Sequence, residues 1–144
     1  MQELLSPTEL AAARVLVQPV QTVPMKIFEE LEANDILFID SSHVAKVGSD
    51  LTFLLLRVLP RLRPGVMVHF HDLFYPNSYP MEWIRGGRAW NESIFLRAFL
   101  INNPAFEIVA FNCFAGQTFP ELFRGAGDRF LANSGGSLWL RRRG

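Results

Sequence analysis

The chain has 144 residues, of which 49% are hydrophobic, 12% aromatic and 19% charged, with 14 basic residues balanced by 14 acidic ones. This composition excludes an intrinsically disordered chain, and the balanced charge gives no electrostatic sign of nucleic acid or a membrane as a partner. A single cysteine, Cys113, excludes an internal disulfide framework and a cysteine-rich zinc site. We therefore expect one domain over residues 1–144, located in the reducing cytoplasm.

The first half of the chain alternates short helical and strand patterns. Residues 36–39 are four consecutive large apolar residues, which is typical of a strand covered on both faces, as in parallel sheets. The next helix has a wide apolar stripe, and a second apolar strand follows it. This order predicts a βαβ crossover in which Asp35–Ile39 and Val66–Phe70 are adjacent parallel strands joined by the helix Asp50–Leu59. Three further elements are expected before it: a helix at Pro7–Ala13, a strand at Arg14–Gln18 and a helix at Met25–Leu31.

The second half of the chain is less regular. Prolines and paired glycines between Leu73 and Ala89 predict an irregular segment. A helix is expected from Asn91 to Ile101, and two closing strands are expected at Phe106–Phe111 and Ser137–Leu140. The sequence therefore predicts an α/β domain.

Polar side chains follow the two apolar strands at the point where each strand ends. Asp40 and His43 come after the first strand, and His71 and Asp72 end the second. Because open parallel sheets bind ligands at the carboxyl ends of their strands, these four residues are expected to lie on one rim. Carboxylate and imidazole groups there could hold a divalent cation, and an imidazole near neutral pKa could move a proton.

Each of these residues also has a purely structural interpretation. Asp40 could cap the turn after its strand, and His43 could be an ordinary surface histidine. His69 shares a strand face with His71 and is interpreted as a core or crevice histidine. Two other classes of protein therefore stay open: a metal-dependent hydrolase that uses His69, His71, Asp72 and Asp40, and a non-catalytic remnant or binding module.

Two segments resemble a known family. Residues 35–43 (DILFIDSSH) and 59–72 (LPRLRPGVMVHFHD) are similar to the C-terminal part of class I S-adenosylmethionine-dependent methyltransferases. The branch they resemble methylates hydroxyl groups of small molecules and sugars, as catechol and macrocin methyltransferases do. The resemblance extends over most of the chain, from about Arg14 to Arg141. It implies a methyltransferase with S-adenosylmethionine as cofactor and a small-molecule acceptor as partner.

The resemblance also implies roles for individual residues. Val20 and Gln21 match the loop that lies along the adenine of the cofactor, and Asp40 is the third implied cofactor-binding residue. His43 falls where some sugar methyltransferases have the general base. Three residues match a metal site of metal-dependent members: Asp40, His71 and Asp72. The imidazole at position 71 departs from that pattern, and it favours a softer metal than Mg²⁺ or no metal at all.

One part of the family pattern is missing. Members begin with a strand, a glycine-rich turn and a second strand that ends in an acidic residue for the ribose, and this sequence has none of these. The resemblance therefore implies a Rossmann-like methyltransferase sheet, mostly parallel with an antiparallel last strand, that lacks the N-terminal strands. Such a fragment is expected to be inactive alone. It would expose one sheet edge, through which two copies could associate.

Overall fold

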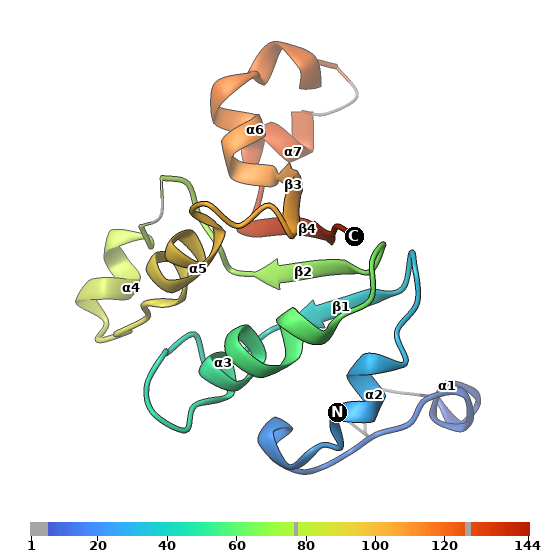
Figure 1. The fold of residues 1–144 in the computed structure, drawn as a ribbon. Helices are drawn as coiled ribbons and strands as arrows, with labels where there is room; N and C mark the ends of the chain where they lie inside the picture. Colours follow the sequence, from blue (N-terminus) through green and yellow to red (C-terminus); the bar gives the residue numbers. More distant parts are fainter. Residues whose placement is uncertain (1–5, 77, 126–127) are drawn as a thin grey trace.

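The computed structural model of the chain describes residues 6–76, 78–125 and 128–144, and its centre is a four-stranded sheet. The strands are β1 (Ile36–Ile39), β2 (Met67–His71), β3 (Phe106–Phe111) and β4 (Ser137–Arg142), arranged in the order β1-β2-β4-β3 (Figure 1). β1 and β2 are parallel, whereas β4 is antiparallel to both β2 and β3. Three strands therefore run in one direction and the last strand in chain order runs in the other, which confirms the predicted fold class.

The predicted βαβ crossover is confirmed. β1 pairs with β2 in a register that places Phe38 opposite His69. The connecting helix begins as α3 (Asp50–Phe53), where the Ser49 side chain accepts a hydrogen bond from the backbone N–H of Thr52. It widens into a π-helical segment (η3, Leu54–Val58) and ends in a 3-10 turn (η4, Leu59–Arg61). Pro60 explains the ending, because a proline has no N–H to continue the helical hydrogen bonds.

The other helices are short. They are α1 (Pro7–Ala12), η2 (Val20–Thr22), α2 (Met25–Glu29), α4 (Met81–Arg85), α5 (Glu92–Leu100), α6 (Asn112–Thr118), η5 (Pro120–Phe123) and α7 (Asp128–Ala132). The helices α1, α2 and α5 match the sequence predictions closely, whereas α4, α6 and α7 were not predicted. None of the helices in the described residues is long and apolar enough to cross a membrane.

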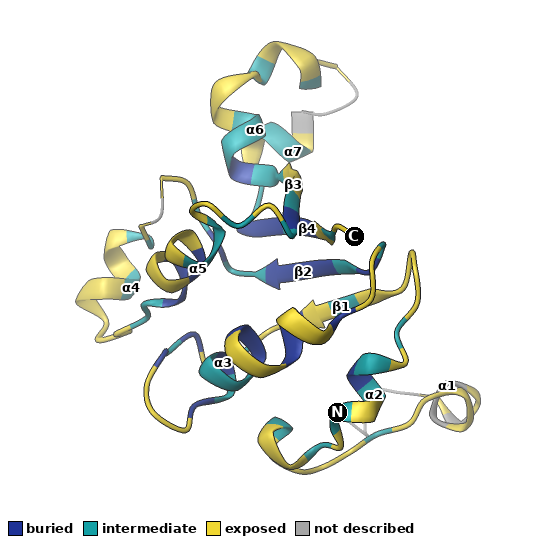
Figure 2. Ribbon diagram, viewed as in Figure 1, coloured by how far each residue is buried: buried dark blue, intermediate teal, exposed yellow. Residues whose placement is uncertain are grey.

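The core lies between one face of the sheet and the helices α3 and α5 (Figure 2). Side chains alternate along β2, so Val68 and Phe70 point into this core while His69 points to the opposite face. Leu138 and Leu140 of β4 complete the buried layer. These contacts fix the carboxyl ends of β1 and β2 beside the N-terminus of α5.

The predicted strand at Arg14–Gln18 is wrong. These residues form no strand, and the side chain of Val17 is 88% exposed. A β-branched apolar run forms a strand only where a partner accepts its hydrogen bonds, and no described strand pairs with it. Within the described residues β1 pairs with β2 alone, so the outer edge of β1 is open, as the sequence predicts.

Candidate active site

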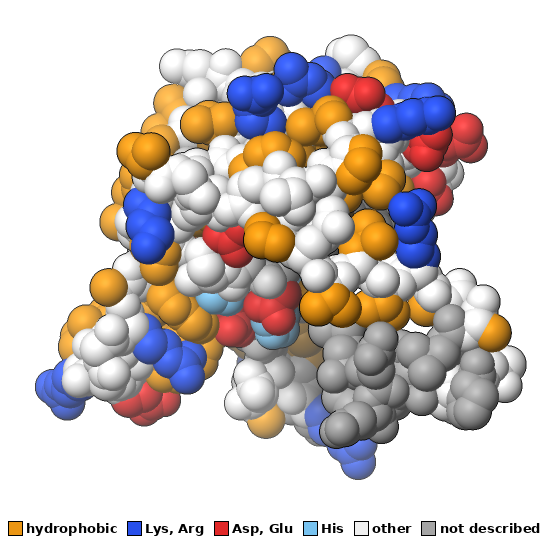
Figure 3. Space-filling view, turned by 90° about the horizontal axis from the view of Figure 1, so that it is seen from below, with side chains coloured by type: hydrophobic (Ala, Val, Ile, Leu, Met, Phe, Trp, Pro, Cys, Tyr) orange, Lys and Arg blue, Asp and Glu red, His pale blue; other side chains and the backbone are white. Residues whose placement is uncertain are grey.

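The predicted site residues lie on one rim of the sheet. Asp40 follows β1, Asp72 follows β2, and His43 lies in the loop between Asp40 and α3. Seen from below, histidine and acidic side chains gather at one place on the surface (Figure 3). His43 and Asp72 both have positive φ angles of 57°, so the backbone turns sharply in the loop after β1 and directly after β2. Such backbone conformations are uncommon outside glycine and occur frequently at functional sites.

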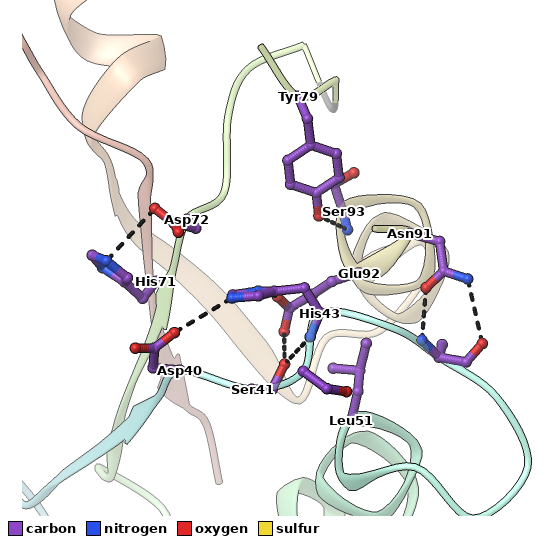
Figure 4. A network of polar contacts seen from close by, with 12 residues as sticks. Asp40, Ser41, His43, Leu51, His71, Asp72, Tyr79, Asn91, Glu92 and Ser93 are labelled. Carbon is purple, nitrogen blue, oxygen red and sulfur yellow. Dashed lines mark hydrogen bonds and ion pairs between the residues drawn. The ribbon is translucent and has the colours of Figure 1, made fainter. Parts of the chain in front are cut away.

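Both the side chain and the backbone of His43 are held by neighbouring residues. Its side chain is buried, and its ring packs against the indole of Trp90 with 4.0 Å between the ring centroids. The Nδ1 atom lies 2.6 Å from Oε2 of Glu92 (Figure 4). The backbone carbonyl of His43 accepts hydrogen bonds from the N–H groups of Asn91 and Glu92 at the start of α5. The imidazole is therefore fixed in one orientation.

Glu92 is the residue that sequence reasoning missed. It lies in the first turn of α5 and is only 1% exposed. Its Oε1 accepts a hydrogen bond from the hydroxyl of Ser41 at 3.2 Å, and its Oε2 faces His43. An acidic residue in the first helical turn is usually explained by the helix dipole. Nothing in the local sequence indicates that this carboxylate is buried, because the contact joins positions 49 residues apart.

Asn91 fastens the His43 loop to α5. Its side-chain oxygen accepts a hydrogen bond from the N–H of Ala45 at 2.6 Å, and its side-chain nitrogen donates to the carbonyl of Ala45 at 3.3 Å. These two hydrogen bonds therefore join the N-terminal end of α5 to the loop after β1.

The second ring nitrogen of His43 faces the rim. Its Nε2 lies 3.4 Å from Oδ1 of Asp40, whose side chain is 58% exposed. Because Glu92 accepts the Nδ1 proton, the neutral ring has its lone pair on Nε2. Burial alone would lower the pKa of His43, but the hydrogen bond and charge of Glu92, together with the charges of Asp40 and Asp72, raise that pKa above 6.5. This arrangement can accept a proton at the rim.

The predicted metal site is not assembled. His71 lies 3.6 Å from its neighbour Asp72, while Asp40 faces His43. Within the described part of the chain, no three His, Cys, Asp or Glu side chains are arranged to hold a metal ion. Asp40 and Asp72 follow neighbouring strands, but their position on the same rim does not bring their side chains together around one metal ion. These residues therefore do not fit a metal ion.

His69 has the structural environment that the sequence predicts. It is 5% exposed, and its ring lies 4.5 Å from the rings of both Phe38 and Trp139. Burial, with a smaller contribution from His71, lowers the pKa of His69, so the ring is neutral at pH 7. Its Nδ1 atom has no hydrogen-bond partner among the described residues. His69 is therefore a buried histidine packed between aromatic rings, on the sheet face opposite the main core.

Val20 and Gln21 lie beside a second recess. They line an open hollow of about 460 Å³ together with Ser42 and Lys46 of the loop between β1 and α3 and with Asp50, the first residue of α3. The side chain of Gln21 donates a hydrogen bond to the carbonyl of Gly48 at 2.9 Å. Asp40 does not line this hollow, so the structure brings together two of the three predicted cofactor residues.

The comparisons with known proteins give one match. Residues 3–73 match a family model described as a methyltransferase domain. The comparisons with curated proteins and with solved structures found no match. The matched segment contains the entire βαβ crossover, both strand ends and the hollow beside Val20. Together with the mixed α/β sheet, this match supports an S-adenosylmethionine-dependent methyltransferase family for the chain.

Proposed function

We propose that this chain carries the acceptor-binding half of a methyltransferase that modifies a hydroxyl group of a small molecule or sugar. The observation that carries the proposal is the buried pair of His43 and Glu92, which leaves Nε2 of His43 facing the rim. Transfer of a methyl group to a hydroxyl oxygen requires removal of a proton, so a fixed imidazole is the group this reaction needs.

His43, Glu92 and Asp40 have separate roles in the proposed reaction. Nε2 of His43 takes the proton as the acceptor O–H bond breaks, and the negative charge of Glu92 stabilises the imidazolium that forms. Asp40, on the exposed side of the ring, orients the acceptor hydroxyl. When bound, S-adenosylmethionine supplies an electrophilic methyl group.

The described residues offer contacts for only one part of the cofactor. The hollow beside Val20 and Gln21 has a polar and apolar lining that suits an adenine ring. No glycine-rich turn follows β1, β2 or β3 within the described residues, so the contacts that hold the methionine part are not supplied there. This distribution supports a role for the chain at the acceptor side of the reaction.

Steady-state kinetics of a full-length parent containing this chain would test the proposal. We measure S-adenosylhomocysteine formation with catechol and with a hydroxylated sugar as acceptors. His43→Ala should reduce turnover roughly 10²–10⁴-fold, because a general base contributes that much, and should leave cofactor affinity nearly unchanged. The matched variant His69→Ala should mainly lower the melting temperature, because the buried His69 ring packs against Phe38 and Trp139.

Two outcomes would contradict the assignment. Near-wild-type turnover in His43→Ala would show that another group removes the proton. A folded His69→Ala protein without activity would identify His69 as the better candidate for the base.

A further inference from the structure

A second cavity lies beside α5, and its lining is mostly apolar. It has a volume of about 450 Å³, which is within the range of small-molecule sites. One face of α5 contributes Leu96, Arg97 and Leu100, and the facing wall comes from β3, α6 and the loop after Asp72. Neither the proton transfer at His43 nor the hollow beside Val20 uses these residues.

Three of the four aromatic rings that line this cavity contact one another. Tyr75 meets Phe111 and Phe114 edge to face, with centroid distances of 6.2 and 5.0 Å. The backbone N–H of Tyr75 donates to the Sγ atom of Cys113 at 2.9 Å, which fastens this loop to α6. Because the rings are held by their neighbours and by the backbone, the wall exists before any ligand arrives.

Arg97 is the one charged residue that lines the cavity. Four other arginines pair with glutamates, namely Arg61, Arg63, Arg141 and Arg143. The guanidinium of Arg97 forms no ion pair within the described part of the chain, although it lies at an apolar opening where a counterion would be favourable. An apolar cavity with one unpaired cation is complementary to an apolar molecule with one anionic group.

We propose that this cavity binds an aromatic carboxylate: a planar apolar ring system against Tyr75, Phe111 and Phe114, with its carboxylate on Arg97. Flat rings suit the wall because aromatic faces and edges attract each other beyond simple area burial. The planar guanidinium suits the carboxylate, because its N–H groups match the two oxygens. The proposal does not depend on methyl transfer, because none of its residues takes part in the chemistry at His43.

Calorimetry on this chain with two matched probes tests the proposal. The probes are 2-naphthoate and its uncharged analogue 2-naphthamide, which share the ring system and differ in charge. We expect the wild-type chain to bind one equivalent of 2-naphthoate about two- to fivefold more tightly than 2-naphthamide, the range that an exposed ion pair supplies. Arg97→Gln should abolish this difference. Arg85→Gln, which removes an exposed arginine outside the cavity, should preserve it.

A filling variant tests the location. Ile108 lines the cavity from the exposed edge strand β3, so Ile108→Trp should fill it and weaken both probes at least tenfold, with an unchanged melting temperature. Absence of 2-naphthoate binding to the wild-type chain would overturn the proposal. So would equal affinities for the two probes, or a charge preference that survives Arg97→Gln. If Ile108→Trp fails to fold, the comparison of Arg97→Gln with Arg85→Gln decides the question alone.

Discussion

The two ring nitrogens of His43 have different surroundings, and this difference determines what the residue can do. Nδ1 faces a carboxylate that is buried and already hydrogen-bonded to Ser41, so that side of the ring is fixed. Nε2 faces the rim, where the carboxylate of Asp40 is exposed. A histidine with both nitrogens in contact with solvent would have neither the fixed orientation nor the raised pKa.

Glu92→Gln should lower the pKa of His43, because it removes the charge that opposes the effect of burial. Since the folded state of the wild-type chain has the raised pKa, the stability contributed by the pair is fully present below pH 6.5. It is lost as the pH rises through the folded-state pKa. In Glu92→Gln this loss of unfolding free energy on the alkaline side should disappear. Urea unfolding between pH 5.5 and 9, with an NMR titration of His43, measures both effects.

Glu82→Gln is the matched control. It also removes one negative charge, but from an exposed glutamate on α4 that does not contact His43. A pH dependence that is identical in wild type and Glu92→Gln would show that the pair does not form in solution.

At the scale of elements, the turn between η4 and β2 determines how the crossover returns to the sheet. Gly65 has a φ of +89°, and an added Cβ there would lie 2.6 Å from the Cβ of Ala33. Its N–H donates to the carbonyl of Arg142 and its carbonyl accepts from the N–H of Asn34. The turn therefore joins the start of β2 to the segment just before β1 and to the end of β4.

Gly65→Ala should destabilise the chain more than Gly48→Ala. Both glycines have positive φ angles, so each alanine incurs backbone strain of about 1 kcal/mol, but only position 65 adds a steric clash. An added Cβ at Gly48 has no atom within 4 Å. Equilibrium urea unfolding of the two variants gives both free energies. Equal losses would mean that Ala33 moves aside without cost.

At the scale of the whole molecule, the described strands form a sheet in which β4 is inserted antiparallel between β2 and β3. The polar site is located where the parallel pair β1 and β2 ends, and the apolar cavity is located between α5 and β3. The helix α5 connects the two regions, because Glu92 in its first turn faces the site while Arg97 in its last turn lines the cavity. The site proposed for proton removal and the cavity proposed for ligand binding thus share one helix.

The isolated chain should bind S-adenosylmethionine weakly or not at all. The hollow beside Val20 and Gln21 offers contacts for one end of the cofactor, but the glycine-rich turn and the acidic ribose partner are missing from the sequence. Several hydrogen bonds worth about 1 kcal/mol each are therefore lost. Calorimetry with S-adenosylmethionine measures this directly, and a low-micromolar dissociation constant would contradict the expectation.

Local sequence patterns were sufficient for much of the fold and for part of the site. The four consecutive apolar residues at 36–39 predict a strand, and the apolar stripe after Ser49 predicts the helix that follows. Both patterns lie within short segments, so the local sequence was sufficient to predict the crossover. Asp40, His43 and Asp72 could be placed on one rim for the same reason, since parallel strands end on the same side of a sheet.

Tertiary structure decided the remainder, because the relevant contacts join segments far apart in the chain. Glu92 is buried against His43 across 49 positions, which gives the imidazole its orientation and its raised pKa. The apolar run at Arg14–Gln18 has strand propensity, but no strand among the described residues pairs with it, so it stays outside the sheet. The metal ligands predicted from residue types remain in separate contacts. Residue types and local periodicity determine which elements form and where they end, but only packing determines which side chains meet.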